Sequence, residues 1–267
     1  MIIDSLTHIT PDGRWFNTSH DAGVERLLYE MDRAGVEKSI VVPLAGYIEN
    51  EFVRKTCDRF PDRLIAGASI NPMDFPDQTS VRIALMSILE DESFKVLKLH
   101  PRLHGYDPLD PRCLVVFETV SGLDRPVPVW LDSIFRSQKC LLSKPPVDII
   151  HELALRFPNQ TIVLLHSCGA QMLELGELVG SCENLVLDLS LSLLYYGTSS
   201  LKQDVEFLLQ KRDLRVIAGS DFPEYTPSQY LKVLTDCVDQ GVITPDKFNH
   251  IAGENISKII INQGWRS

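Results

Sequence analysis

Eight apolar runs recur along this chain, and a polar residue stands at or near the end of most of them. The runs cover residues 1–9, 38–44, 64–70, 95–100, 126–132, 161–166, 184–190 and 214–220. They are rich in Val, Ile and Leu and mostly continuous in apolarity, which is typical of strands buried on both faces. The last run lies in LRVIAGSDFP (Leu214–Pro223) and ends at Asp221. A carboxylate at the mouth of an apolar strand is costly to desolvate, so we expect it to have a partner.

Amphipathic segments of helical length lie between the runs. They include residues 22–34, 52–60, 147–157 and 201–209. Strands that alternate with helices indicate a parallel sheet, and eight such units favour a closed, single-domain (β/α)8 TIM barrel over residues 1–267. The final stretch, residues 245–263, is expected to form one or two helices on the barrel's outside. The chain has neither GxGxxG after the first strand nor GxxxxGK[ST], so nucleotide-binding folds lose support.

Composition narrows the function classes. The formal charge of −10 argues against a nucleic-acid partner. No stretch is long and apolar enough to span a bilayer, and the N-terminus carries acids where a signal peptide needs a basic start. The six cysteines include no CxxC and resemble reduced residues of a cytosolic protein. We therefore expect a cytoplasmic protein that acts on a small molecule. Because such barrels are often dimers, a homodimer is a further expectation.

Polar side chains at the strand ends carry the candidate chemistry. Residues two apart on a strand share a face, so Leu6 and His8 point to one side of the first strand, and Lys98 and His100 point to one side of the fourth. Three further polar residues end strands five, six and eight: Asp132, His166 and Asp221. In a closed barrel the carboxyl ends of all strands meet at one rim, so these side chains can converge. Imidazole and carboxylate groups are ligands for a divalent ion such as zinc, which lowers the pKa of bound water.

A series of segments over nearly the whole chain carries a further signal. In chain order they read MIIDSLTHI, CDRFPDRLIAGASINP, KVLKLHP, PVPVWLD, FPNQTIVLLHSCG, ENLVLDLS, RVIAGSDFP and IAGENISKI. Together they resemble the amidohydrolase superfamily, specifically the amidohydrolase-related group that includes aminocarboxymuconate semialdehyde decarboxylase. The resemblance implies a (β/α)8 barrel with a mononuclear metal site, usually zinc, that hydrolyses or decarboxylates small molecules.

The resemblance carries over residue by residue, with two departures. His8 matches the second histidine of the family's HxH motif and would be a ligand, but Leu6 stands where the first should be and cannot bind a metal. Asp132 takes the strand-five place of a histidine ligand, and its oxygen can still coordinate. Asp221 matches the strand-eight aspartate, which binds the metal and orients or deprotonates water. His166 matches a strand-six histidine that acts as an acid/base or transition-state-stabilising residue.

Three interpretations of this degenerate site stay open. In the leading one, His8, Asp132 and Asp221 hold one divalent ion, zinc or the more oxygen-preferring manganese, and metal hydroxide attacks an ester, lactone or amide. Non-oxidative decarboxylation is a close variant. In the second, Leu6 fills the vacant volume, the metal is lost, and the barrel is a ligand-binding pseudoenzyme. In the third, His166 and Asp221 perform acid/base chemistry without a metal.

Cations near the rim are candidates for substrate binding. Lys98, His100, Arg102 and Arg136 are expected to contact a small, anionic substrate, with arginine forming a bidentate fork on a carboxylate or phosphate. The alternative for Lys98 is an ion pair with an acidic neighbour inside the barrel. Two acids outside this set, Asp4 and Asp188, are predicted to be structural hydrogen-bond acceptors.

Overall fold

Eight parallel strands close into a barrel in the computed structural model, which describes residues 1–211 and 215–260. The strands are β1 (Ile3–Thr7), β2 (Lys38–Val41), β3 (Leu64–Ser69), β4 (Val96–Leu99), β5 (Val129–Asp132), β6 (Ile162–Leu165), β7 (Leu185–Asp188) and β8 (Val216–Ile217). Each pairs with the next in chain order. The ring closes where the Asp221 N–H donates to the Leu6 carbonyl at 3.0 Å and the His8 N–H donates to the Phe222 carbonyl at 2.8 Å. The predicted barrel is confirmed; residue 214, the first of the eighth predicted run, lies outside the described residues.

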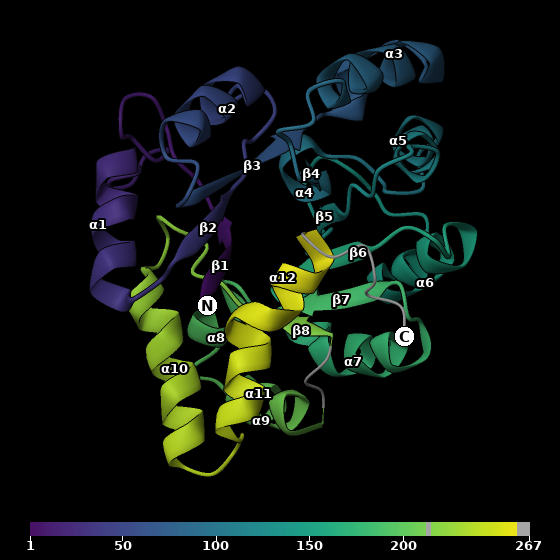
Figure 1. Cartoon of the computed structure of the whole chain (residues 1–267). Helices are drawn as coiled ribbons and strands as arrows, with labels where there is room; N and C mark the ends of the chain where they lie inside the picture. The colour runs from purple at the N-terminus through teal and green to yellow at the C-terminus, as the bar shows by residue number, and fades with distance from the viewer. Residues whose placement is uncertain (212–214, 261–267) are drawn as a thin grey trace.

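Helices form a ring around the strands (Figure 1). The long ones are α1 (Val24–Ala34), α2 (Asn50–Arg59), α3 (Gln78–Leu89), α5 (Pro111–Ser121), α6 (Pro146–Arg156), α7 (Met172–Ser181), α9 (Leu201–Lys211) and α10 (Pro227–Asp239). Shorter turns are η1 (Pro72–Asp74), α4 (Pro101–His104), η2 (His166–Gln171), α8 (Ser192–Tyr195) and α11 (Pro245–Asn249). The four helices named from the sequence are confirmed to within two residues at each end. No helix in the described part of the chain has the length and apolar character needed to cross a membrane.

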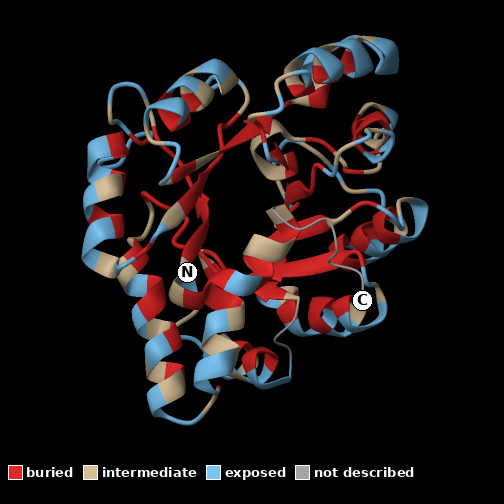
Figure 2. Ribbon diagram, viewed as in Figure 1, coloured by how far each residue is buried: buried red, intermediate tan, exposed pale blue. Residues whose placement is uncertain are grey.

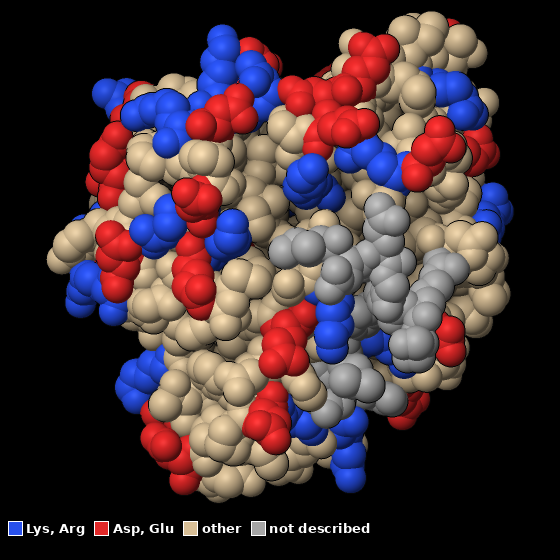
Figure 3. Space-filling view, in the orientation of Figure 1, with Lys and Arg blue, Asp and Glu red and all other residues tan. Residues whose placement is uncertain are grey.

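Apolar side chains pack on both faces of the sheet, as the continuous apolar runs predict. The strands are coloured almost entirely as buried in Figure 2. The inner cluster fills the barrel and includes Ile3, Leu6, Val96 and Trp130. The larger outer cluster joins the strands to the helices. Acidic and basic side chains are intermixed over the helices on the face drawn in Figure 3, which is typical of a solvated outer surface.

The C-terminal segment lies across one end of the barrel, where the prediction placed it on the outside. A π-helical turn, η3 (His250–Glu254), leads into α12 (Asn255–Ile260), which crosses the ring in Figure 1. Ile256 and Ile259 belong to the inner apolar cluster. The predicted helices are present, and α11 packs on α10, but η3 and α12 differ from the predicted placement. The inward side chains at the strands' amino ends need an apolar cover, and these two elements supply it. Residues 261–263 of the predicted segment lie outside the described residues.

Candidate active site

A cavity of about 410 Å³ opens at the carboxyl ends of the strands. Its lining residues are His8, Trp15, Phe16, Leu44, Lys98, His100, Arg102, Leu103, Lys139, His166, Asp221 and Glu224. Six of the predicted site residues are among them, and Asp132 lies beside them, fully buried. Arg136 does not line the cavity. It is exposed in the loop after β5, where its neighbour Phe135 is the buried residue, so the structure does not bring Arg136 to the site.

His8 is held in one tautomer at the end of β1. Its Nδ1 lies 2.7 Å from the Val42 carbonyl oxygen. A carbonyl only accepts, so Nδ1 carries the proton and the lone pair is on Nε2. Burial first, and the Lys98 charge second, hold the pKa of His8 well below its usual range, so the ring is neutral. The Trp15 ring stacks on it with centroids 5.2 Å apart.

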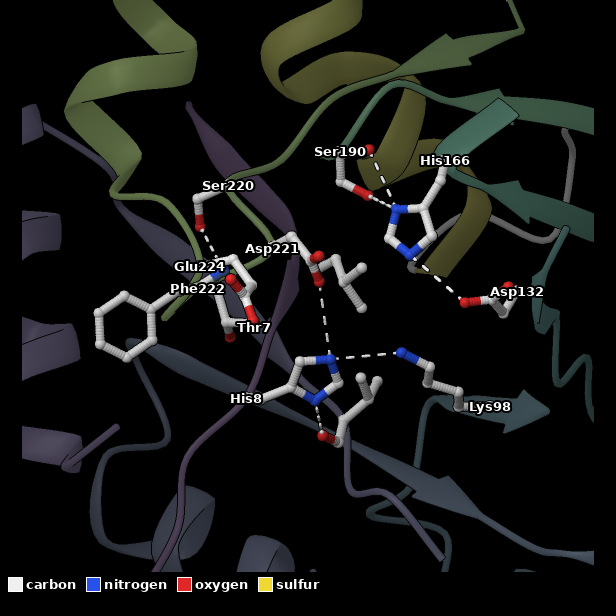
Figure 4. Close-up of polar contacts among 12 residues, drawn as sticks. Thr7, His8, Lys98, Asp132, His166, Ser190, Ser220, Asp221, Phe222 and Glu224 are labelled. Atoms are coloured by element: carbon white, nitrogen blue, oxygen red, sulfur yellow. Dashed lines mark hydrogen bonds and ion pairs between the residues drawn. The ribbon is translucent and has the colours of Figure 1, made fainter. Parts of the chain in front are cut away.

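Lys98 reaches the same space from β4 (Figure 4). Its side chain is only 2 % exposed, and its Nζ donates to His8 Nε2 at 3.3 Å. Burial lowers the pKa of Lys98 below its ordinary value, although the charges of Asp221 and Asp132 act in the opposite direction. Asp221 Oδ1 lies 3.7 Å from His8 Nε2. Because that nitrogen bears a lone pair, the His8 ring supplies no positive charge to Asp221; the charges that act on this carboxylate are those of His166 and Lys98.

Asp221 is a buried carboxylate with an unusual backbone. Its φ is 56°, in the left-handed region that few non-glycine residues adopt. Burial raises the pKa of its carboxyl group, and the charges of His166 and Lys98 only partly oppose this. A carboxylate with a raised pKa is a stronger base, which suits proton abstraction from water.

Asp132 is surrounded by positive or protonatable groups. Its Oδ2 accepts from Arg102 Nη2 at 3.2 Å and lies 3.3 Å from His100 Nδ1 and 3.6 Å from His166 Nε2. The Ile134 N–H donates to Oδ1 at 3.0 Å. Burial would raise the pKa of Asp132, but the charges of His100, Arg102 and His166 outweigh it and hold the pKa below 3.8. Asp132 is therefore ionised and engaged through both oxygens.

The backbone that presents His166 is strained. His166, Ser167 and Cys168 have φ values of 63°, 46° and 59°, and each left-handed L-residue costs about 1–2 kcal/mol. Serine hydroxyls hold the turn. Ser192 Oγ donates to the His166 carbonyl at 2.7 Å, and Ser133 Oγ accepts from the Cys168 N–H at 2.6 Å. Strain retained in this way is typical of a functional site.

His166 is oriented by the chain after β7. Its Nδ1 lies 3.1 Å from the Ser190 carbonyl oxygen, which makes Nδ1 the donor there and directs Nε2 towards Asp132 (Figure 4). Ser190 Oγ donates to Asp188, and Ser5 Oγ donates to the other oxygen of Asp188 at 2.5 Å. The predicted role of Asp188 as a hydrogen-bond acceptor is confirmed.

Asp4 fixes the residue before Asp221 in the same way. It accepts from Ser220 Oγ at 2.6 Å and from the Ser220 N–H at 2.9 Å, so its predicted role as an acceptor is also confirmed. Burial raises the pKa of Asp4 to about 7, although the Ser220 hydrogen bonds oppose the rise. The two buried acids thus anchor the backbone beside both candidate catalytic residues.

Two charged residues of the cavity, Glu224 and Lys139, were missed from the sequence. Glu224 lines the wall near Asp221, and its Oε1 accepts from Trp15 Nε1 at 2.7 Å. Its position three residues after Asp221, in the same loop, was the available signal. This contact ties the long loop after β1 to the loop after β8 and holds Trp15 over His8.

The donor set does not fit a divalent metal ion. Leu6, at the first position of the HxH pattern, is fully buried among apolar side chains. The Nε2 lone pair of His8 is taken by Lys98, and Asp132 is engaged by Arg102. Within residues 1–211 and 215–260, no three histidine, cysteine or acidic side chains are grouped so that they could hold an ion. We therefore derive no chemical step through a metal.

Comparisons with known proteins agree with this architecture. A family model described as amidohydrolase matches residues 3–255, so the chain belongs to the amidohydrolase family. No curated protein matches it.

Three solved structures illustrate the likeness. An uncharacterized TIM-barrel protein from Bordetella bronchiseptica has a TM-score of 0.74 at 17 % identity, over 98 % of this chain and 99 % of that one. A probable 2-pyrone-4,6-dicarboxylic acid hydrolase from Acinetobacter baumannii, with citric acid bound, has a TM-score of 0.67 at 14 % identity, over 97 % of this chain and 98 % of that one. A 5-carboxyvanillate decarboxylase from Novosphingobium aromaticivorans, complexed with manganese, has a TM-score of 0.68 at 12 % identity, over 97 % of this chain and 96 % of that one. At these identities the likeness shows a shared fold.

Proposed function

We propose that this chain is a hydrolase that acts on a small, carboxylate-bearing ester, lactone or amide. The observation that carries the proposal is one cavity that combines a basic carboxylate, Asp221, with an imidazole, His166, and a rim guanidinium, Arg102. Its volume of about 410 Å³ is in the range of small-molecule sites. Membership of the amidohydrolase family supports the same class of chemistry.

Asp221 and His166 divide the proton transfers between them. Asp221 takes a proton from a water molecule as the water oxygen bonds to the substrate's carbonyl carbon. His166 gives a proton through Nε2 to the leaving oxygen or nitrogen as its bond to that carbon breaks. The proton held by Asp221 then returns to His166, so the reaction consumes one water and leaves both side chains unchanged. Asp132 and Ser190 keep the ring of His166 in the orientation that this transfer needs.

Arg102 is the proposed contact for the substrate carboxylate. Its side chain is 39 % exposed at the cavity, and one of its nitrogens is fixed by Asp132. The planar guanidinium has further N–H groups that match a carboxylate in a bidentate geometry. Two of the similar structures carry names of acidic molecules, a pyrone dicarboxylic acid and a carboxyvanillate, which supports an anionic substrate here.

The other interpretations predict different outcomes. Metal-dependent hydrolysis through His8, Asp132 and Asp221 remains a prediction from the sequence, and it is left out of this proposal because the donors do not fit. Decarboxylation would release carbon dioxide without consuming water. A ligand-binding barrel would bind the molecule and leave it intact. A cytoplasmic location and a homodimer also remain predictions.

A substrate screen with paired analogues tests the proposal. Each lactone or ester carries a free carboxylate in one form and its neutral methyl ester in the other. We expect turnover of at least one carboxylate form, and a loss of 10²-fold or more in kcat, a rough figure for removal of a general base, in Asp221→Asn. Arg102→Met should raise KM much more for the carboxylate form than for the neutral analogue. Binding without turnover, carbon dioxide release, or full activity of Asp221→Asn would contradict the proposal.

A further inference from the structure

A metal ion at the end of β1 would have to be coordinated by the lone pair on His8 Nε2. His8 Nδ1 donates to the Val42 carbonyl at 2.7 Å, which leaves Nε2 as the acceptor. Lys98 Nζ lies 3.3 Å from that nitrogen and donates to it. A single lone pair can accept an ammonium proton or bind a metal ion, but it cannot do both at once. Lys98 therefore competes directly with any ion at His8.

Charge balance favours the lysine at this position. A buried ammonium needs a negative partner, and the carboxylate of Asp221 faces the same space from the loop after β8 (Figure 4). The second buried carboxylate, Asp132, is neutralised by Arg102 at 3.2 Å. Each acid at the floor of the cavity therefore already has a cationic side chain near it. A divalent ion would add two positive charges beside an ammonium group.

Leu6 closes the other coordination position. It shares the inward face of β1 with His8, but it belongs to the apolar cluster that fills the barrel and is fully buried. The space that a second imidazole would occupy is thus filled by a side chain with no donor atom. The two departures from a metal site are consistent with one another. The apolar side chain of Leu6 stands in place of one metal ligand, and the ammonium group of Lys98 donates to the lone pair of the other, His8.

We propose that the ammonium group of Lys98 takes the place of a divalent cation on His8 and supplies the positive charge beside that ring. The catalytic role of Lys98 that follows rests on the proposed function. As the water oxygen bonds to the carbonyl carbon, the electron pair of the C=O π bond moves to the carbonyl oxygen, and a Lys98 N–H donates to that oxyanion. The water proton goes to Asp221, and no oxidant or reductant is required.

Metal binding by the full chain tests whether Lys98 replaces a metal ion on His8, and it needs no knowledge of the substrate. Zn²⁺ and Mn²⁺ are titrated separately by calorimetry, followed by dialysis and elemental analysis. The native chain is expected to retain well under one ion per molecule. Lys98→Met frees the lone pair and should raise Zn²⁺ affinity about tenfold, and Leu6→His combined with Lys98→Met should raise it by 10²-fold or more, the scale expected for an added imidazole ligand. Lys95→Met removes an exposed lysine just before β4 and should change nothing.

A second measurement needs no substitution in the barrel core. The ring nitrogens of His8 in the ¹⁵N-labelled native chain should report a protonated Nδ1 and a hydrogen-bonded Nε2, and added Zn²⁺ should leave both signals in place. Stoichiometric binding of either metal to the native chain, lost in His8→Ala, would overturn the inference. So would a Zn²⁺-induced shift of His8 Nε2.

Activity separates this inference from the proposed function. With a substrate in hand, turnover should persist in a chelator, and Lys98→Met should lower kcat while KM changes little. Turnover that requires added metal would refute the role of Lys98 and leave the hydrolase proposal standing. If no ester, lactone or amide is hydrolysed but the metal results are as expected, the proposed function fails. The inference that Lys98 replaces a metal ion on His8 then still stands.

Discussion

Asp4 makes the stability of the barrel depend on pH in a direction opposite to that of most carboxylates. Its side chain is fully buried, and burial raises its pKa from 3.8 to about 7, with the Ser220 hydrogen bonds opposing the rise and the charge of Asp188 adding to it. Between these two values the folded protein holds a proton that the unfolded chain releases. The stabilisation from this group is complete below pH 4 and is lost as the pH rises through 7.

The size of the effect follows from the shift. A difference of about three pKa units corresponds to at most about 4 kcal/mol, at 1.36 kcal/mol per unit. Asp4→Asn keeps an oxygen that can accept from the Ser220 N–H and has no charge to bury. Relative to the native chain, this variant should gain up to about 4 kcal/mol in unfolding free energy between pH 4 and pH 8. Asp188, whose pKa burial also raises, keeps its own contribution in both proteins.

Urea unfolding at a series of pH values measures this gain. The native chain and Asp4→Asn are compared from pH 4 to pH 8, with Asp62→Asn, an exposed carboxylate, as the matched control. The difference between native and Asp4→Asn should widen as the pH rises, and the control should track the native chain. A constant difference across the range would show that Asp4 is ionised in the folded protein, and the reasoning would be wrong.

Two stability predictions concern packing and backbone strain. Leu6→Ala should lower the free energy of unfolding by about 2–5 kcal/mol in urea, because a fully buried side chain is removed from the barrel interior; a loss under 1 kcal/mol would be inconsistent with that packing. Gly169→Ala should lower it by roughly 1–3 kcal/mol, because φ is +59° and the added Cβ would lie 2.9 Å from Tyr196 Oη. Gly122→Ala, where φ is −93°, is the control and should be close to neutral.

The fold was predictable because it depends on short-range patterns. Continuous apolar runs specify strands buried on both faces, and the intervening amphipathic segments specify helices on the outside. The C-terminal segment shows the limit of such patterns. Ile256 and Ile259 mark a helical face that is buried, but the pattern is the same for a helix on the outer ring and for one that covers the end of the barrel.

The site was predictable in its members and less so in its contacts. His8, His166 and Asp221 line one cavity because parallel strands of a closed barrel end at one rim. Arg136 is displaced from it, since a loop residue points inward or outward according to its neighbours' packing. Glu224 was missed because an acid in a loop carries no distinctive pattern.

The amino-acid sequence by itself determined the barrel, the rim and the residue types that gather there, because these follow from periodicity and strand polarity. Only the tertiary structure decided which groups pair. Lys98 Nζ donates to His8 Nε2 at 3.3 Å, and Arg102 neutralises Asp132 at 3.2 Å. In both contacts the two residues are far apart in the chain. Hydrogen bonds and buried charges respond to differences of a few tenths of an ångström. Strand register and side-chain rotamers determine those distances, and both are consequences of the packed whole.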